Sequence, residues 1–259
     1  MRFASLGSGS GGNALVVEAG ATRLLVDCGL GLREVERRLG RLGLEAGGFA
    51  AVLVTHEHSD HLDGVFPFAR RHGVRVHLTH GTLAAAGEAA FGEGAPGYGL
   101  TMVDSHAPFA VGDIEVHPFP VPHDAREPVQ YVLSDGVRRL GVLTDTGAPT
   151  RHIQAMLSGC DGLVLECNHD PAMLAASPYP GWLKERIGGG FGHLPNAAAA
   201  AILDAIDRSR LRHVVAAHLS AQNNTPELAR AALAGVLGCA AEWVGVAEQD
   251  GGFDWRSID

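Results

Sequence analysis

Residues 51–64 read AVLVTHEHSDHLDG. An apolar, β-branched run, typical of a buried strand, leads directly into three histidines and a carboxylate within six positions. These residues are His56, His58, Asp60 and His61. Imidazole and carboxylate groups at such close spacing indicate a metal site. A catalytic zinc takes at least three protein ligands, so a pair of ions would need about three more ligands from elsewhere in the chain.

Three further candidates each follow a strand-like run. They are His123, Asp145 and His218. Sites in α/β folds commonly assemble where the carboxyl ends of strands meet, and a carboxylate such as Asp145 can bridge two ions. Taken alone, each of the three would be better explained as a capping or hydrogen-bonded core residue. They become candidates because the cluster at 56–61 needs partners.

Strand and helix patterns alternate along the chain without a linker rich in Pro, Gly or Ser, which favours one α/β domain over residues 1–259. The glycine-rich segment 86–99 is expected to be a surface loop. Apolar runs predict strands at 1–6, 13–18, 22–27, 50–54, 74–78, 111–119, 129–134, 138–144, 161–166, 212–217 and 241–244. Helical patterns predict helices at 31–42, 61–72, 80–90, 150–158, 179–187, 196–208 and 226–236.

The composition is that of a globular chain, with 46% of its 259 residues hydrophobic and 19% charged. A net charge of −9 argues against a large basic face for nucleic acid, but it suits a nuclease whose positive charge is concentrated at bound metal. No apolar run has the length of a membrane span and no signal peptide is recognisable, so we expect a cytoplasmic protein. The four scattered cysteines are expected to be reduced. The oligomeric state stays open.

Five ordered motifs resemble those of the metallo-β-lactamase superfamily. They are DCG at 27–29, THEHSDH at 55–61, a single histidine at 123, TDTG at 144–147 and HLS at 218–220. The resemblance implies a four-layer αββα sandwich that holds two divalent metal ions at one edge. A His/Asp ligand set without thiolate suits zinc and also tolerates manganese, iron or nickel.

The resemblance also implies a role for each motif residue. Asp27 would orient a ligand histidine from behind, and Asp60 would serve catalysis as well as metal binding. The implied ligands are His56, His58 and His123 for one ion, Asp60, His61 and His218 for the other, and Asp145 as the bridge.

A finer resemblance lies between the last two motifs. The segments LECNHDPAML, SPYPGWLKERI, GHLPNAAAA and HLSAQNN resemble the YycJ/WalJ branch of the superfamily, whose members act as 5′–3′ exodeoxyribonucleases. Pro195 stands where that branch has Ser, and Ser177 stands where it has Gly. The resemblance implies an insert on the substrate side at about 166–196 and a dinuclear phosphodiesterase that uses a metal-activated hydroxide on DNA.

Phosphodiester cleavage also benefits from a proton donor for the leaving oxygen. His193 and His169 are the two candidates, although His193 could instead satisfy a helix entry, and Asn168-His169-Asp170-Pro171 also reads as a capping turn. Lys184 and Arg186 could hold the phosphate backbone or form a solvated helix face. Asn223 and Asn224 could bind substrate or cap a loop.

Three rival functions remain open. A thioester or lactone hydrolase of the glyoxalase-II type shares the H-x-H-x-D-H pattern but not the extended match at 166–196. Hydrolysis of β-lactams is disfavoured by the lack of an export signal. A binding or signalling protein without activity is disfavoured by the complete ligand set.

Overall fold

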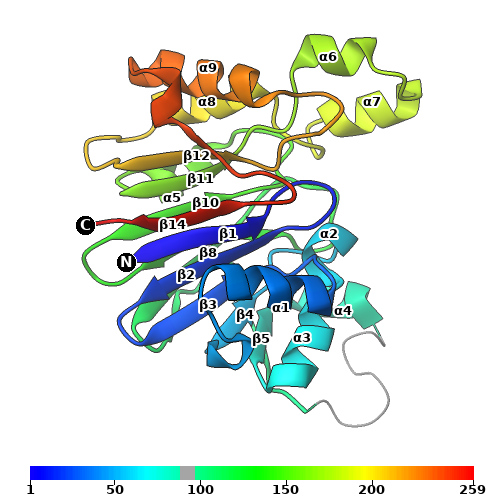
Figure 1. The fold of residues 1–259 in the computed structure, drawn as a ribbon. Coiled ribbons are helices and arrows are strands. Elements are labelled where there is room, and N and C mark those ends of the chain that lie inside the picture. The colour runs from blue at the N-terminus through cyan, green and yellow to red at the C-terminus, as the bar shows by residue number, and fades with distance from the viewer. Residues whose placement is uncertain (88–96) are drawn as a thin grey trace.

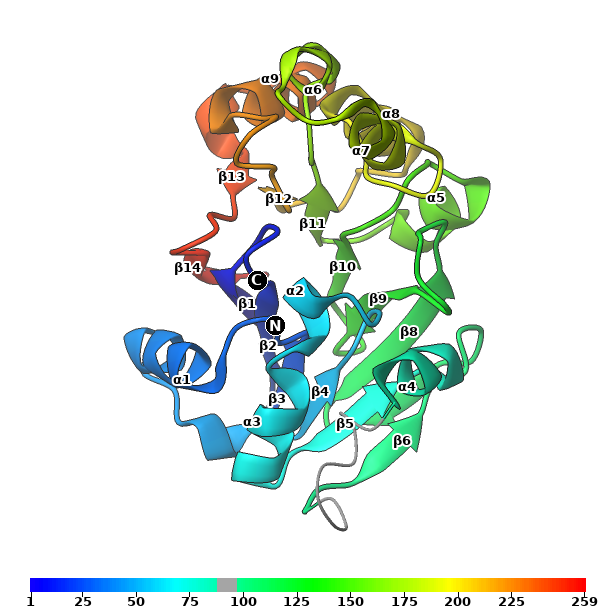
Figure 2. The same cartoon turned by 90° about the vertical axis from the view of Figure 1, so that its right-hand side faces the viewer.

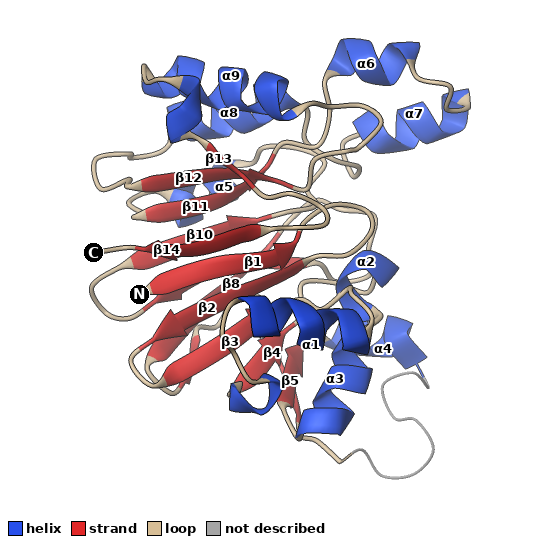
Figure 3. Cartoon of the chain, in the orientation of Figure 1, coloured by secondary structure: helices blue, strands red, loops and turns tan. Residues whose placement is uncertain are grey.

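Two seven-stranded sheets pack face to face in the computed structural model, which describes residues 1–87 and 97–259 (Figure 3). The first sheet has the order β14 (Phe253–Ser257), β1 (Arg2–Gly7), β2 (Ala14–Ala19), β3 (Thr22–Val26), β4 (Ala51–Leu53), β5 (Arg75–Leu78) and β6 (Leu100–Met102). The second has the order β13 (Gly245–Val246), β12 (His213–Ala217), β11 (Gly162–Glu166), β10 (Arg139–Leu143), β9 (Val129–Ser134), β8 (Ile114–Pro120) and β7 (Phe109–Val111).

Helices cover the outer faces of both sheets (Figure 1). The first sheet is covered by α1 (Leu32–Arg41), α3 (Val65–His72) and α4 (His80–Ala86), while α2 (Ser59–Leu62) lies at its strand-end edge. The second is covered by α5 (Arg151–Leu157), α8 (Asn196–Ala205) and α9 (Pro226–Leu237), while α6 (Pro171–Ala176) and α7 (Gly181–Gly188) lie beyond the strand ends. The αββα sandwich expected from the sequence is confirmed.

Three clusters of buried apolar side chains fill the three interfaces between layers. Leu39 and Phe68 belong to the cluster between the helices and the first sheet. Phe3 and Tyr131 belong to the cluster between the two sheets, and Ile202 to the cluster between the second sheet and its helices. All five are fully buried. Burial of this apolar surface is the main stabilising force, and it leaves the strand ends free for polar groups.

Each sheet is antiparallel in one half and parallel in the other. The strands β3, β4, β5 and β6 run parallel, as do β10, β11, β12 and β13. Their carboxyl ends therefore meet at one edge of the sandwich, which faces the viewer in Figure 2.

Several boundaries differ from those predicted. The predicted strand 241–244 is wrong: Ala241–Trp243 forms a 3-10 turn (η3), because a four-residue apolar run does not distinguish a strand from a buried turn. The strand 111–119 is a hairpin of β7 and β8, with Gly112 at a φ of +56°. The helix 61–72 is broken between α2 and α3 near Gly64, whose amide donates to Cys28 O at 2.8 Å.

Other differences concern elements that were not predicted or not described. The short strands β6 and β14, the helix α6 and the 3-10 turn η1 (Ala46–Gly48) were not predicted. Of the predicted helix 80–90, residues 88–90 lie outside the described residues, as does most of the segment 86–99. Among the described helices, none combines the length and apolar character that crossing a bilayer requires.

The turn that follows β3 packs closely against the segment that follows β4 and contains Asp60 and His61. Cys28 N donates to His61 O at 2.9 Å. A Cβ on Gly29 would overlap the carbonyl group of Asp60, whereas nothing lies within 4 Å of a Cβ on Gly31. The first glycine is therefore required by close backbone packing, and the second is not.

We expect Gly29→Ala to lower the free energy of unfolding by about 1–3 kcal/mol, because the backbone around Asp60 must move to admit the methyl group. Gly31→Ala, two residues along the same turn, should change it by no more than about 0.5 kcal/mol. Urea denaturation of the two variants measures the difference. Equal stability of the two would contradict the packing described here.

Candidate metal centre

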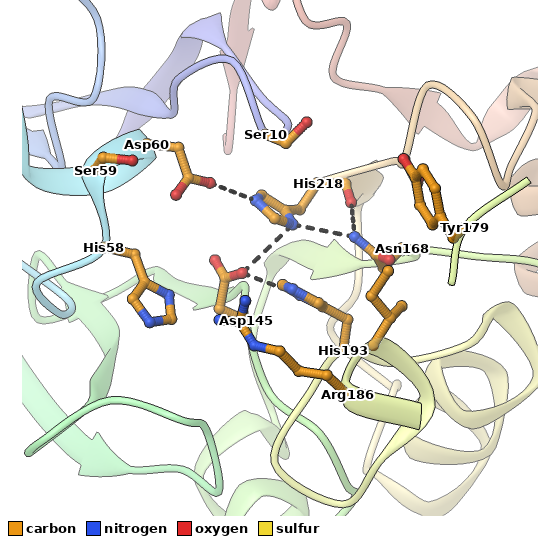
Figure 4. Close-up of a pocket in the computed structure, with 12 residues that line it drawn as sticks. Ser10, His58, Ser59, Asp60, Asp145, Asn168, Tyr179, Arg186, His193 and His218 are labelled. Carbon is orange, nitrogen blue, oxygen red and sulfur yellow. Dashed lines mark hydrogen bonds and ion pairs between the residues drawn. The ribbon is translucent and has the colours of Figure 1, made fainter. Parts of the chain in front are cut away.

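The seven side chains predicted as ligands meet at the strand-end edge. His56 and His58 follow β4, and His123 follows β8. Asp145 follows β10 and His218 follows β12. The remaining two, Asp60 and His61, lie in α2, which turns back over the same edge (Figures 2 and 4). Within the described residues, the groups of side chains that could share an ion are drawn mainly from this set.

Three residues at this edge have left-handed backbone conformations. The φ angles are 58° at Asp27, 53° at Asp145 and 53° at His218, and no other non-glycine residue among those described has a positive φ. Such conformations are unfavourable for these residue types and persist only where the surroundings impose them. They turn each side chain inward at the point where its strand ends.

The carboxylate of Asp27 sets the orientation of two histidines. It accepts hydrogen bonds from Thr55 N at 2.7 Å and Thr55 Oγ1 at 2.8 Å, and it lies 2.8 Å from His61 Nδ1. Because the Thr55 hydroxyl donates to Asp27, it accepts from His56 Nδ1, 3.0 Å away. Both imidazoles thus carry a proton on Nδ1 and direct Nε2 into the cluster.

The two Nε2 atoms differ in their protein partners. His56 Nε2 is buried without a hydrogen bond, whereas His61 Nε2 lies 2.8 Å from the Asp145 carboxylate and 3.0 Å from the Asn13 amide nitrogen. Burial and the neighbouring His61 hold the pKa of His56 well below its usual value, which keeps this imidazole neutral. His56 Nε2 and Asp145 Oδ2 are thus buried without hydrogen-bond partners beside further imidazoles, and this donor set fits a divalent metal ion.

The other histidines are oriented by different partners. His123 Nδ1 lies 3.0 Å from Gly192 O, which leaves Nε2 facing His58 Nδ1 at 3.2 Å. His218 Nε2 lies 3.2 Å from Asp60 Oδ2. Burial opposes ionisation of Asp145, but the charges of His218 and His61 outweigh it and hold its pKa well below the usual value. The carboxylate is therefore ionised and available to a metal.

Glu166 belongs to the same cluster, although the sequence analysis did not single it out. Its buried carboxylate accepts from Thr146 N at 2.8 Å and lies 2.8 Å from His193 Nδ1. It groups with Asp145, His193 and His218 as a further set that could hold a metal. Glu166 is the last residue of β11, so the criterion that selected Asp145 and His218 would also have found it.

A cavity of about 350 Å³ opens over the cluster. One side is formed by residues of the cluster, including His58, Asp60 and His218 (Figure 4). The opposite side is formed by the segment around α7, which contributes Tyr179, Arg186, Ile187 and His193. Arg186 Nε donates to Asp124 Oδ2 at 2.6 Å, which holds the guanidinium at the rim.

His193 lies inside this cavity, within reach of both carboxylates. Its Nδ1 is 2.8 Å from Glu166 and 3.1 Å from Asp145. Burial alone would lower the pKa of His193, but these two carboxylates raise it to about 10. Two buried carboxylates thus hold His193 at the wall of the cavity.

Four other predicted site residues do not line the cavity over the cluster. They are His169 and Lys184, and Asn223 and Asn224. His169 and Lys184 line a neighbouring cavity, and Lys184 Nζ donates to Ala175 O at 2.6 Å. Asp170 accepts from Ala172 N and Met173 N at the start of α6, so the capping interpretation of the turn at 168–171 is confirmed. The structure gives no support to a catalytic His169 or to substrate contact by Lys184.

The predicted substrate contacts of Asn223 and Asn224 are likewise not supported. Both side chains are buried. Asn224 Nδ2 donates to Cys167 O at 2.7 Å and pairs with Asn196, while Asn223 contacts Ser220. The amide nitrogens thus bond within the loop after His218 and to its neighbours, while Asn223 Oδ1 is buried without a partner.

Comparisons with known proteins agree with this geometry. A sequence model described as the Beta-lactamase superfamily domain matches residues 22–218. The chain belongs to the metallo-β-lactamase superfamily. Exodeoxyribonuclease YycJ of Bacillus anthracis is 35% identical over 243 residues, which cover 92% of this chain and 89% of that protein. Exodeoxyribonuclease WalJ of Streptococcus pneumoniae is 32% identical over 253 residues, which cover 95% and 91%.

Solved structures confirm the fold. The metallo-β-lactamase fold protein YhfI from Bacillus subtilis has a TM-score of 0.75 at 16% identity and covers 99% of both chains. Zn²⁺-bound PqqB from Methylobacterium extorquens has a TM-score of 0.73 at 18% identity, with 99% and 100% covered. The expectation of a metal-dependent hydrolase similar to the YycJ/WalJ branch is confirmed by the family model and the two relatives.

Replacement of Asp27 by Asn tests the orientation of the histidines. The amide places a donor against Thr55 or His61, so one imidazole loses its Nδ1 proton acceptor, and metal affinity should fall about 10–100-fold. Competition with a chromogenic chelator measures the affinity. The matched control is Asp113→Asn, which alters a carboxylate that accepts from Ala21 N and Thr22 Oγ1 outside the cluster. A metal affinity equal to wild type in Asp27→Asn would contradict this role.

Proposed function

We propose that this chain is a dinuclear metal-dependent phosphodiesterase that degrades DNA as a 5′–3′ exonuclease. Two observations support the proposal. The relatives at 35% and 32% identity are named exodeoxyribonucleases and align over nearly their whole length. The cavity also combines the metal-type cluster with Arg186 and His193 on its opposite side, which suits a phosphate held between them. This second observation carries the proposal.

The proposed ligands form two sets around a shared carboxylate. One ion would be held by His56, His58 and His123, the other by Asp60, His61 and His218, with Asp145 between them. Zinc is the first choice for such a nitrogen and oxygen set, and manganese, iron and nickel are the alternatives. When bound, two divalent ions lower the pKa of water and offset the negative charge of a phosphodiester.

The remaining residues of the cavity position the substrate. Arg186, fixed by Asp124, would donate to a phosphate oxygen at the rim. His193 is oriented by Glu166 and Asp145 through Nδ1, which leaves Nε2 to donate a proton or hydrogen bond to the leaving oxygen. The segment at about 166–196, which includes α6 and α7, would thus form the substrate side of a single domain.

Hydrolysis of a thioester or lactone of the glyoxalase-II type is the alternative function. The same metal cluster would serve it, but such substrates have no phosphate for Arg186 and His193 to contact. The two functions therefore assign different roles to the side of the cavity formed by α7. Assays on a panel of substrates distinguish between these functions.

We expect phosphodiester cleavage to exceed thioester and β-lactam hydrolysis at equal metal loading. The assay compares 5′-labelled single- and double-stranded DNA and RNA, an aryl phosphodiester and a thioester. DNA should release its labelled 5′ mononucleotide first. The rate should fall only slightly with salt, because 20 basic residues against 29 acidic ones leave few cations to displace counterions from DNA. Thioester turnover tenfold faster than DNA cleavage would favour the alternative.

The role of His193 is tested by the leaving group. His193→Ala should lower DNA cleavage about a hundredfold or more, because an alkoxide leaving group needs an acid. The loss on an aryl phosphodiester should be much smaller, since that leaving group departs without a proton. His152→Ala, an exposed histidine on α5, is the control.

Three outcomes would change the role of His193. Equal losses on both substrates would make it a phosphate-binding residue. Loss of bound metal, measured by elemental analysis, would make it a ligand. Unchanged cleavage of DNA would remove it from the reaction.

A further inference from the structure

A second polar cavity lies at the edge of the sandwich remote from the metal-type cluster, on the side of the chain termini (Figure 1). Its volume is about 330 Å³, and it is lined by Arg138, Asp161, Ser209, Arg210, Leu211 and Arg212. These residues lie at the amino ends of β10, β11 and β12, whose carboxyl ends carry the cluster. Asp161 directly precedes β11 and Glu166 ends it, and five residues of strand span about 16 Å. The cavity is therefore separate from the candidate active site.

A buried carboxylate fixes two of the three arginines. Asp161 is fully buried and accepts hydrogen bonds from Arg138 Nη1 at 3.1 Å and from Arg210 Nη2 at 3.0 Å. It also accepts from Arg139 N at 2.9 Å and from Arg210 Nε at 3.3 Å. A carboxylate has about four acceptor positions, so these donors use the capacity of Asp161. Two guanidinium groups are thus held in place beside the cavity, and no acceptor is left for a third.

The third arginine is without such a partner. Arg212 N donates to Asp161 O at 2.7 Å, which places this residue beside the same aspartate. Its side chain is exposed and makes no hydrogen bond or ion pair with any residue that the structure describes. The cavity is lined by three guanidinium groups and one carboxylate, which leaves a net charge of +2. Like charges gathered around one cavity repel one another, and an anion between them removes the repulsion.

The acidic side chains nearby are already engaged. Asp207 accepts from Ser209 N at 2.9 Å, and Asp135 Oδ2 lies 3.2 Å from the amino terminus. Neither residue lines the cavity. The protein therefore leaves the balancing negative charge to an anion from solution.

We propose that Arg138, Arg210 and Arg212 bind a phosphate group, either as inorganic phosphate or as the terminal group of a phosphomonoester. Such a group carries a charge of about −1.5 to −2 at neutral pH, which matches the net charge of the cavity. Guanidinium groups donate paired hydrogen bonds to phosphate oxygens. The described residues that line the cavity include no aromatic ring to stack on a base, so the phosphate itself is the group recognised. This site goes beyond the proposed phosphodiesterase activity and does not depend on it.

Equilibrium dialysis of metal-loaded protein against radiolabelled orthophosphate measures the binding. In Arg212→Gln the affinity of one site per chain should fall about tenfold or more, because the variant loses a charged donor to the anion. Any phosphate held at the metal centre is common to both proteins and does not affect the difference. Arg33→Gln is the matched control and should bind as wild type does. Arg33 is likewise exposed and without a side-chain partner among the described residues, but it lies on α1 over the other sheet.

A competitor distinguishes the two sources of the phosphate group. Thymidine 5′-monophosphate that displaces the label at the same concentration as unlabelled phosphate would identify the phosphate group alone as the ligand. Displacement at a concentration lower by about tenfold would identify a phosphomonoester. Both results support the site when the displaced label is the portion that Arg212→Gln fails to bind.

Two further measurements locate the site. Selenate, a dianion whose anomalous scattering reveals its position in crystals, should lie among Arg138, Arg210 and Arg212. Hydrolysis of an aryl phosphodiester by Arg212→Gln should equal that of wild type, because Arg212 lies at the opposite end of its strand from the cluster.

Three results would overturn the proposal. The first is phosphate binding by Arg212→Gln that equals wild type in number of sites and in affinity. The second is selenate found at the metal centre and not among the arginines. The third is weaker binding of DNA by Arg212→Gln with phosphate binding unchanged, which would assign these arginines to a nucleic-acid backbone instead.

Discussion

The carboxylate of Asp27 is the group on which the arrangement of the cluster depends. It binds the backbone and hydroxyl of Thr55 and the Nδ1 of His61, and through the Thr55 hydroxyl it also fixes His56. One buried acid therefore determines which nitrogen of these two imidazoles faces the cavity. Metal sites gain affinity and geometry from such outer contacts, which orient the ligands before an ion arrives.

The strand ends supply the remaining constraint. Asp27, Asp145 and His218 all have φ near +55°, a conformation that costs free energy at each residue and is offset by the packing of two sheets around them. Glycines permit the close contacts between the connecting loops, as at Gly29 against Asp60 and at Gly147 against Phe191. The sandwich and its connecting loops therefore hold these polar groups together at the strand ends.

Much of the site could be predicted because its residues follow strands. The cluster at 56–61 is contiguous, and its need for further ligands pointed to His123, Asp145 and His218, which the structure brings to the same edge. Glu166 has the same position at a strand end and lies in the segment LECNHDPAML, but it belongs to none of the five ordered motifs.

Other features could not be read from the sequence. The helical pattern over 61–72 does not reveal that the helix is interrupted near Gly64, because the interruption depends on contact with the turn after β3. Asn223 and Asn224 have the composition of a binding loop, and only the fold shows that their amides are buried. Such contacts join segments far apart in the chain, which local patterns do not encode.

The metal content of the purified protein tests the central claim, that the edge of the sandwich holds a pair of ions. Elemental analysis should give two divalent ions per chain, and anomalous diffraction should place both within the cluster. His56→Ala should lose mainly one ion and His61→Ala mainly the other, because the two histidines belong to different ligand sets. One ion or fewer in fully loaded wild-type protein, with His218 turned away from the cluster, would contradict the account.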